Sequence, residues 1–140
     1  MPFDYHSVQG GIGRIWIGRG DILGQELIVR NDYIFESKIY EGVRWLLIDQ
    51  TANISIKISS EEVRIIKGQD DRLASVLPEL VTAVVVPTNV SFGLTRMWEL
   101  LTERPGWSVC AFRTRPEAEA WLRDEVRRRF NLELPPNLHP

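Results

Sequence analysis

Three glycines after an early apolar segment have a spacing close to that of a dinucleotide-binding turn. They stand at Gly18, Gly20 and Gly24, after a predicted strand and at the opening of a predicted helix. Such glycines let the backbone approach a pyrophosphate, and Asp49, at the end of the next strand, lies where a carboxylate would bind a ribose. Asp21 would place a negative charge beside that pyrophosphate. We keep a dinucleotide-binding domain as a minor alternative and otherwise expect no cofactor.

The chain offers few groups for acid–base or nucleophilic catalysis, since it has two histidines and one cysteine. His6 lies in a predicted edge strand with no second histidine or cysteine near it, and His139 lies in the tail. Cys110 lies inside an apolar strand, where thiols are usually packing groups. No base is available to activate a nucleophile, and no ligand spacing indicates a metal site. We therefore expect neither an enzyme nor a metal centre.

Aromatic and polar side chains provide a candidate ligand or contact patch. Trp16 lies on the face of its strand opposite to its isoleucine neighbours, so it either covers the sheet beneath a helix or marks an exposed binding patch. Asn89, Phe92 and Arg96 belong to a segment that follows a predicted parallel strand. Ligands of open α/β sheets bind at that end of the strands. We assign Trp16, Asn89, Phe92 and Arg96 to the patch.

Apolar periodicity predicts the strands that position these residues. Alternating apolar and polar residues favour an antiparallel hairpin near the N-terminus. Short apolar runs further along the chain are typical of strands buried on both faces. The five predicted strands are Phe3–Val8, Ile12–Gly18, Val43–Ile48, Thr82–Val86 and Trp107–Phe112. A loop is expected after Asp49, before a helix that begins near Ser59.

Four helices are expected between and after these strands. In the first, Leu23–Phe35, Arg30 falls between the apolar positions. Ser59 and Glu62 have the spacing of a capping box and predict the start of the second helix, whose apolar stripe is interrupted at Asp70. The remaining helices are expected over Phe92–Leu101 and Thr114–Phe130.

The order β-β-α-β-α-β-α-β-α predicts a single α/β domain with a mixed, mainly parallel five-stranded sheet and an N-terminal antiparallel hairpin. At 140 residues and 44% hydrophobic composition, the chain is large enough for one packed core. We assign residues 1–130 to this domain and expect the proline-rich tail, 131–140, to be extended or frayed. A net charge of -2 gives no basic field for nucleic acid, and no apolar stretch is long enough to span a membrane, so we expect a cytoplasmic protein.

Several short strings resemble the STAS-type fold of bacterial anti-sigma-factor antagonists. The likeness is greater to a group of small bacterial proteins known as SpoIIAA-like or STAS/SEC14-domain proteins, and it covers roughly residues 1–123. The strings are Gly20–Leu27, Arg44–Asp49, Ile58–Val63, Ser91–Trp98, Val109–Arg113 and Glu117–Leu122. None of them is a catalytic signature.

The resemblance implies a regulatory or protein-interaction module. In the well-understood relatives, a serine at the start of the helix after the central strand is phosphorylated by a partner kinase, and binding to the partner is thereby switched off. The matching positions here are Ser59 and Ser60, with Thr51 and Asp49 in the preceding segment. A helix N-terminus favours a phosphate, but Glu61 would repel it, so a purely structural cap at Ser59 stays open.

We therefore predict a non-enzymatic interaction module whose partner, by resemblance, is a kinase or an anti-sigma-like regulator. A homodimer formed through the hairpin's edge strand is compatible with the sequence. The alternative is a carrier or sensor that holds a small apolar ligand between the sheet and the helices.

Overall fold

The computed structural model describes residues 3–138, apart from the side chain of Ile54. The strands are β1 (Phe3–Val8), β2 (Gly13–Leu23), β3 (Trp45–Lys57), β4 (Leu80–Val85) and β5 (Trp107–Phe112). The helices are α1 (Gly24–Glu36), α2 (Ser60–Ala74), α3 (Asn89–Leu101) and α4 (Arg115–Phe130). A short 3-10 turn, Gln9–Gly11, joins β1 to β2. The predicted order of strands and α-helices is confirmed.

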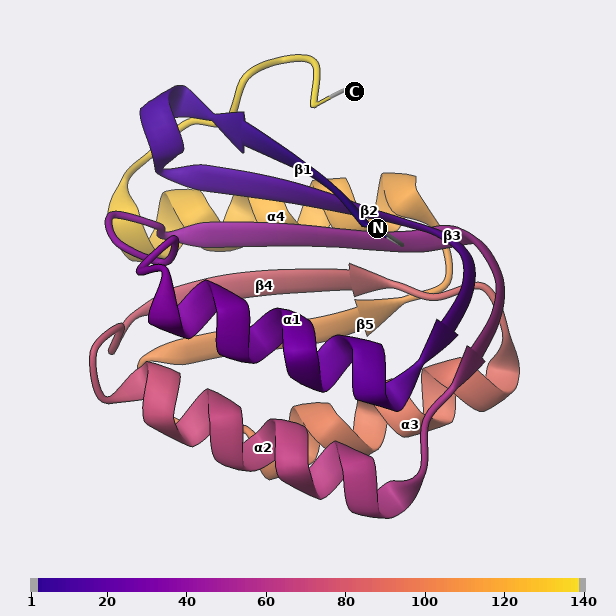
Figure 1. Cartoon of the computed structure of the whole chain (residues 1–140). Helices are drawn as coiled ribbons and strands as arrows, with labels where there is room; N and C mark the ends of the chain where they lie inside the picture. The colour runs from indigo at the N-terminus through magenta and orange to yellow at the C-terminus, as the bar shows by residue number, and fades with distance from the viewer. Residues whose placement is uncertain (1–2, 139–140) are drawn as a thin grey trace.

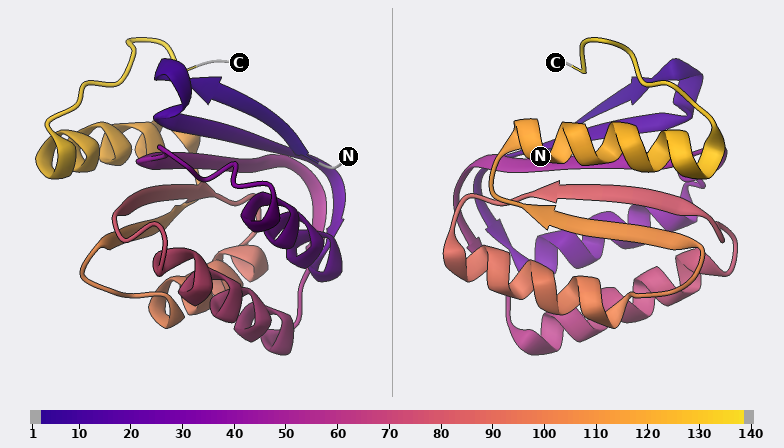
Figure 2. Two further views of the ribbon diagram at one scale, coloured as in Figure 1. Left: turned by 60° about the vertical axis from the view of Figure 1, so that its left-hand side comes forward. Right: turned by 180° about the vertical axis from the view of Figure 1, so that it is seen from behind.

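The five strands form one sheet in the order β1-β2-β3-β4-β5. β1 pairs antiparallel with β2, and every later pair is parallel, which confirms the predicted mixed sheet. Helix α4 covers one face, and helices α1, α2 and α3 lie along the other, so the molecule has three layers (Figure 1 and Figure 2).

Alternate residues of the central strand β3 pack into different layers. Trp45 and Leu47 are fully buried in the core beneath α4, whereas Leu46 and Ile48 belong to the core on the side of α1. Successive side chains of a strand point to opposite faces, so a strand covered on both sides needs apolar residues at every position. These contacts confirm the prediction of a strand buried on both faces.

β2 and β3 continue as a paired ribbon beyond the rest of the sheet. The pairing of β3 with β4 stops at Asp49, but its pairing with β2 continues, through two register shifts, as far as Leu23 and Lys57. The ribbon curves past the end of the sheet and leads into the starts of α1 and α2 (Figure 1). The loop expected after Asp49 is therefore wrong for residues 51–57, because β2 extends alongside them and supplies their backbone partners.

The C-terminal tail packs against the face of the sheet that α4 covers. It has no regular secondary structure over residues 131–138, yet Leu134 and Leu138 are buried in the core. Arg115 Nη2 donates a hydrogen bond of 2.6 Å to the Leu138 carbonyl, and Arg123 Nη1 donates one of 3.3 Å to the Leu134 carbonyl. The tail is extended as expected, but the expectation of fraying is wrong for these residues because the two leucines are anchored in the core.

Replacement of Leu138 by alanine is expected to destabilise the fold. Its side chain is 2% exposed, so truncation leaves a cavity in the core, and we expect the free energy of unfolding to fall by about 2 to 4 kcal/mol. Urea unfolding followed by circular dichroism measures this change. Leu100→Ala is the matched control, since that leucine is 64% exposed, and its effect is expected to stay within about 0.5 kcal/mol. Equal effects of the two variants would contradict the packing of the tail.

Candidate functional site

A cavity of about 130 Å³ lies between the sheet and helices α1, α2 and α3. Its walls are mainly apolar and come from four strands and all three helices. The apolar lining includes Trp16, Leu27, Ile34, Leu46, Val84 and Trp98. Ile56, on the curved β2–β3 ribbon, and Ile58, just after it, also line the cavity. The ribbon therefore contributes to the enclosure as well as to the sheet.

Arg30 of α1 brings a guanidinium group to the wall of the cavity. Its Nε and Nη2 donate hydrogen bonds of 3.2 and 3.0 Å to Asn31 Oδ1. The guanidinium carbon lies 4.6 Å from the ring centre of Phe3 and 4.8 Å from that of Trp16, a favourable placement for a cation over aromatic faces. Arg30 Nη1 is sealed from solvent and has no hydrogen-bond partner among the described residues. Burial lowers the pKa of Arg30 to about 10, so the group stays charged at neutral pH.

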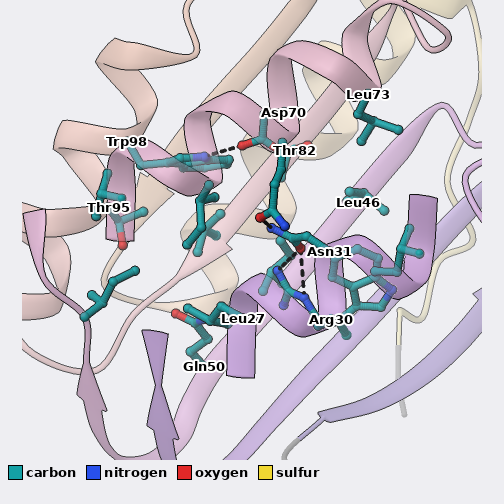
Figure 3. Close-up of a pocket in the computed structure, with 18 of the residues that line it drawn as sticks. Leu27, Arg30, Asn31, Leu46, Gln50, Asp70, Leu73, Thr82, Thr95 and Trp98 are labelled. Carbon is teal, nitrogen blue, oxygen red and sulfur yellow. Dashed lines mark hydrogen bonds between the residues drawn. The ribbon is translucent and has the colours of Figure 1, made fainter. Parts of the chain in front are cut away.

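Asp70 of α2 lines the same cavity and is 9% exposed. The indole Nε1 of Trp98, on α3, donates a short hydrogen bond of 2.5 Å to Asp70 Oδ2. Burial raises the pKa of Asp70 from its ordinary 3.8 to about 7, and this hydrogen bond and the charges of Arg30 and Arg104 offset the effect only in part. The acid is thus partly protonated at neutral pH. Figure 3 shows the Asp70–Trp98 bond and the Arg30–Asn31 bonds within the same pocket.

A chain of polar contacts fixes the wall around Arg30. Asn31 Nδ2 donates to Gln69 Oε1 on α2 at 3.2 Å, so both ends of the Asn31 amide are engaged. Gln69 Nε2 in turn donates to Asp32 Oδ1 at 2.9 Å. Arg72 Nη2 donates to the same oxygen at 3.2 Å and forms an ion pair there. Arg72, a half-exposed arginine of the lining, therefore has its own carboxylate, unlike Arg30.

Both cavity charges occupy positions on the inner faces of their helices. Leu27, Arg30 and Ile34 follow one another at helical spacing on α1, so Arg30 lies on the apolar face and does not fall between its positions as predicted. Asp70 likewise continues the buried stripe of α2 after Val63 and Ile66. The sequence signal for the site was available: one charged residue within each apolar stripe. We instead interpreted the charge at Asp70 as an interruption of the stripe.

Asp49 and Thr51 form a structural contact on the side of the sheet covered by α4. The Thr51 backbone N–H and hydroxyl both donate to Asp49 Oδ1, at 2.9 and 2.6 Å. Arg115 Nη1 of α4 lies 3.2 Å from Asp49 Oδ2 in an ion pair. The carboxylate is buried, and these contacts engage both of its oxygens. A partner contact at Asp49 or Thr51 stays a prediction, and the structure places neither in the cavity.

Ser59 and Ser60 are exposed at the start of α2, beyond the end of β3. The Glu62 backbone N–H donates to Ser59 Oγ at 3.1 Å, and Glu62 Oε1 accepts from the Ser59 backbone N–H at 3.0 Å. This confirms the predicted capping box. The Ser60 hydroxyl takes no part in the capping box, because Ser60 is the first residue of α2. Phosphorylation of either serine stays a prediction.

The four residues assigned to a ligand or contact patch do not form one surface. Trp16 lines the cavity and is buried, so an exposed patch at Trp16 is wrong, because α1 covers it and brings Arg30 over its ring. Asn89 is exposed at the start of α3, Phe92 packs partly against the core, and Arg96 forms an ion pair of 2.7 Å on its own helix. Of the four, the cavity lining includes Trp16 alone.

The glycine-rich segment does not form a phosphate-binding turn. Gly18 and Gly20 lie inside β2, and Gly24 is the first residue of α1. A Cβ at Gly18 would stand 2.6 Å from Asn53 Oδ1, and one at Gly24 would stand 2.5 Å from the Glu62 carboxylate. These glycines make room for side chains of the chain itself. The Glu62 carboxylate beside Gly24 would also repel a pyrophosphate, so the predicted turn between strand and helix is wrong.

Among the described residues, Cys110 is not an activated thiol and no metal-ligand cluster is present. Burial and the charge of Glu99 raise the pKa of Cys110, so its thiol is protonated at neutral pH. Within residues 3–138, no group of three or more His, Cys, Asp or Glu side chains is placed to hold a metal ion. Over the same range, no helix combines the length and apolar character that crossing a membrane requires.

Comparison with known proteins identifies the fold. No family model matches the sequence, and no curated protein matches it. The anti-sigma factor antagonist SpoIIAA, solved in its unphosphorylated form, is similar with a TM-score of 0.50 and 16% identity, over 89% of this chain and 97% of that one. An uncharacterised protein of the DUF3478 family with a SpoIIAA-like fold, from Shewanella loihica PV-4, has a TM-score of 0.49 and 18% identity, over 86% and 91%. The likeness to SpoIIAA shows a STAS-type fold, as the sequence strings predicted.

Replacement of Asp70 by asparagine is expected to stabilise the protein most at alkaline pH. The folded state holds the Asp70 proton more tightly than the unfolded state, because burial raises its pKa to about 7. Below the unfolded pKa, Asp70 is protonated in both states and costs the wild type no stability. As pH rises towards 7, the wild type loses stability because the buried Asp70 resists ionisation. At about pH 8 we expect Asp70→Asn to raise the free energy of unfolding by about 2 to 4 kcal/mol, and by much less at about pH 4.

Chemical denaturation of both proteins at the two pH values measures this difference, and comparison with the wild type cancels the titration of other groups. Asp71→Asn is the matched control. The Lys67 hydrogen bond lowers the pKa of Asp71, so that variant is expected to lose stability at alkaline pH. Asp70→Asn behaving like Asp71→Asn would show that Asp70 is solvated in solution.

Proposed function

We propose that the protein is a non-enzymatic regulatory module that acts by binding, and that its ligand site is the cavity beneath the sheet. The observation that carries this proposal is the cavity itself, because native cores are close-packed and leave few voids larger than a water molecule. The cavity of about 130 Å³ has the mainly apolar walls with a few polar groups that are typical of ligand sites, but it is smaller than the roughly 300 Å³ at which sites for drug-sized ligands begin. This favours the sensor or carrier alternative among the sequence-based predictions.

The size of the cavity limits the ligand. An engineered cavity of roughly 150 Å³ in another protein binds benzene, so this one is suited to a single ring or a short branched chain. Trp16, Trp98 and Trp107 line it, and their aromatic faces favour flat apolar groups. The ligand class is therefore small and compact, with at least one apolar face.

A second candidate function is binding to a protein partner at the start of α2. The similar SpoIIAA structure is of an anti-sigma factor antagonist in an unphosphorylated form, which supports a regulatory role through a protein partner. Ser59 and Ser60 are exposed there and accessible to a partner. A kinase or an anti-sigma-like regulator as partner, homodimer formation and a cytoplasmic location stay predictions.

One helix links the two candidate functions. Helix α2 begins at Ser60, presents Val63 and Ile66 to the cavity, and carries Asp70 one turn after Ile66. A ligand in the cavity would therefore contact the same helix whose exposed start carries Ser59 and Ser60. We infer that ligand occupancy and partner binding are coupled through α2, as a sensor requires.

Benzene is expected to raise the melting temperature of the wild type, because a ligand that binds only the folded state stabilises it. Leu94→Trp, which fills the cavity from α3, is expected to abolish the shift. Val90→Trp is the matched control: it introduces the same side chain one turn earlier on α3, at a residue that is 73% exposed, and is expected to keep the shift. Calorimetry in benzene-saturated buffer measures all three. An equal shift in both variants, or no shift in the wild type, would contradict a ligand-accessible cavity.

Ser59→Asp combined with Ser60→Asp is expected to weaken binding of a protein partner, because two negative charges join Glu61 at the contact surface. Affinity purification from the native host, with wild type and variant side by side, measures the partner retained. Ser75→Asp is the control, because it adds the same group at the exposed opposite end of α2. Equal retention of a partner by all three proteins would contradict a switch at these serines.

A further inference from the structure

Thr82 of β4 is a buried polar residue on an otherwise apolar face of its strand. Alternate residues of a strand point to the same face, so its side chain faces the three helices together with those of Leu80 and Val84, and all three residues line the cavity. Thr82 pairs in register with Leu46 of β3 and with Val109 of β5, so strands flank it on both sides. It is 2% exposed. The little surface that Thr82 retains therefore lies towards the cavity.

The Thr82 hydroxyl is unpartnered but within reach. It makes no hydrogen bond with any of residues 3–138. Over the same range, the buried side-chain atoms that are both unpartnered and sealed from solvent belong to Arg14, Arg30, Asn53 and Arg129. Thr82 Oγ1 is unpartnered without being sealed, so a molecule in the cavity can contact it. Native proteins hydrogen-bond nearly all buried polar groups, and the arrangement at Thr82 is therefore incomplete in the protein alone.

Two further polar side chains of the lining are unpartnered in the same way. Asp70 accepts from Trp98 through Oδ2, and its Oδ1 has no partner among the described residues. Gln50, which is 8% exposed, follows Ile48 on the same face of β3, and its amide makes no hydrogen bond within residues 3–138. None of these atoms is sealed. Figure 3 shows Thr82, Asp70 and Gln50 around the one pocket.

These groups suit an uncharged ligand better than an ion. Arg30 is a poor anchor for an anion, because its Nε and Nη2 already donate to Asn31 and its Nη1 is sealed. A cation would be opposed by the charge of Arg30 and would meet an Asp70 that is partly protonated at neutral pH. A threonine hydroxyl and a glutamine amide can each donate and accept, and a ligand hydroxyl matches them because it also does both.

We propose that the cavity binds a small uncharged molecule with a compact apolar body and one hydroxyl, about the size of phenol, and that this hydroxyl hydrogen-bonds to Thr82 Oγ1. The proposal rests on the proposed ligand-binding function and names the ligand class of that site. We assign the anchor to Thr82 because strands enclose it within the sheet, whereas Gln50 follows the last pair of β3 with β4, at Asp49. The apolar body packs against Leu46 and Val84, which lie beside Thr82 in the lining.

Phenol and toluene test the proposal, because they have nearly the same shape and differ in a hydroxyl against a methyl group. Isothermal titration calorimetry at neutral pH, where phenol is uncharged, measures the ratio of the two affinities in each protein. Thr82→Val keeps the shape of the side chain and is expected to lower this ratio about fivefold, the usual effect of one neutral hydrogen bond. Thr82→Ser keeps the hydroxyl and is expected to keep the ratio.

Thr102→Val is the matched control. Thr102 is as buried as Thr82, lies outside the lining, and donates through its hydroxyl to the Trp98 carbonyl at 2.9 Å. We expect this variant to have the wild-type ratio. A ratio that falls in Gln50→Leu but not in Thr82→Val would assign the hydroxyl to Gln50 and overturn the proposal, with the ligand-binding function intact. Binding of neither phenol nor toluene to the wild type would overturn both, as expected of a cavity that holds only ordered water.

A crystal structure of the wild type soaked in phenol gives a readout that does not depend on any variant. We expect the phenol oxygen within about 3.5 Å of Thr82 Oγ1 and the ring among the apolar walls. Phenol bound in the cavity with its oxygen directed away from Thr82 would overturn the anchor and would leave the ligand-binding function intact.

Discussion

The parallel pairing of β2 with β3 is the constraint on which the rest of the structure depends. It begins at Gly13 and Trp45 in the centre of the sheet and continues to Leu23 and Lys57, well past the last pair that β3 makes with β4. Because the two strands curve together, α1 and α2 start side by side, and their inner faces meet over the sheet. The cavity lies between those inner faces, α3 and the sheet.

The elements of the fold could be predicted from local patterns, because most strands carry their signal in their own residues. Trp107–Phe112 is a short apolar run and is a strand over that same range. The segment 51–57 mixes polar and apolar residues, and its strand depends on the extended β2 beside it, which no local pattern shows. The packing of the tail could not be predicted for the same reason, because Leu134 and Leu138 contact apolar residues of the sheet and α4, far away in the sequence.

The candidate site was harder to predict than the fold. Trp16 was identified because an aromatic residue off the main apolar face of a strand is conspicuous, and two possible locations were kept open for it. Arg30 and Asp70 were not identified, because a charged residue within an amphipathic pattern is ordinarily assigned to the solvent-facing side. Both charged residues are enclosed because α1, α2 and α3 pack around one cavity. The sequence carries the spacing of the two charges, but their shared location requires the tertiary structure.

A cavity whose walls carry two poorly matched charged groups is a burden on the folded state. The raised pKa of Asp70 costs stability of the order of 2 to 4 kcal/mol at alkaline pH, and atoms that line the cavity lack some of the packing contacts of a filled core. Domains of this size are stable by about 5 to 15 kcal/mol, so these costs are a substantial share. Leucine or phenylalanine at Arg30 or Asp70 would fill the space and remove the charges. The presence of a guanidinium and an acid there is better explained by a function that needs them.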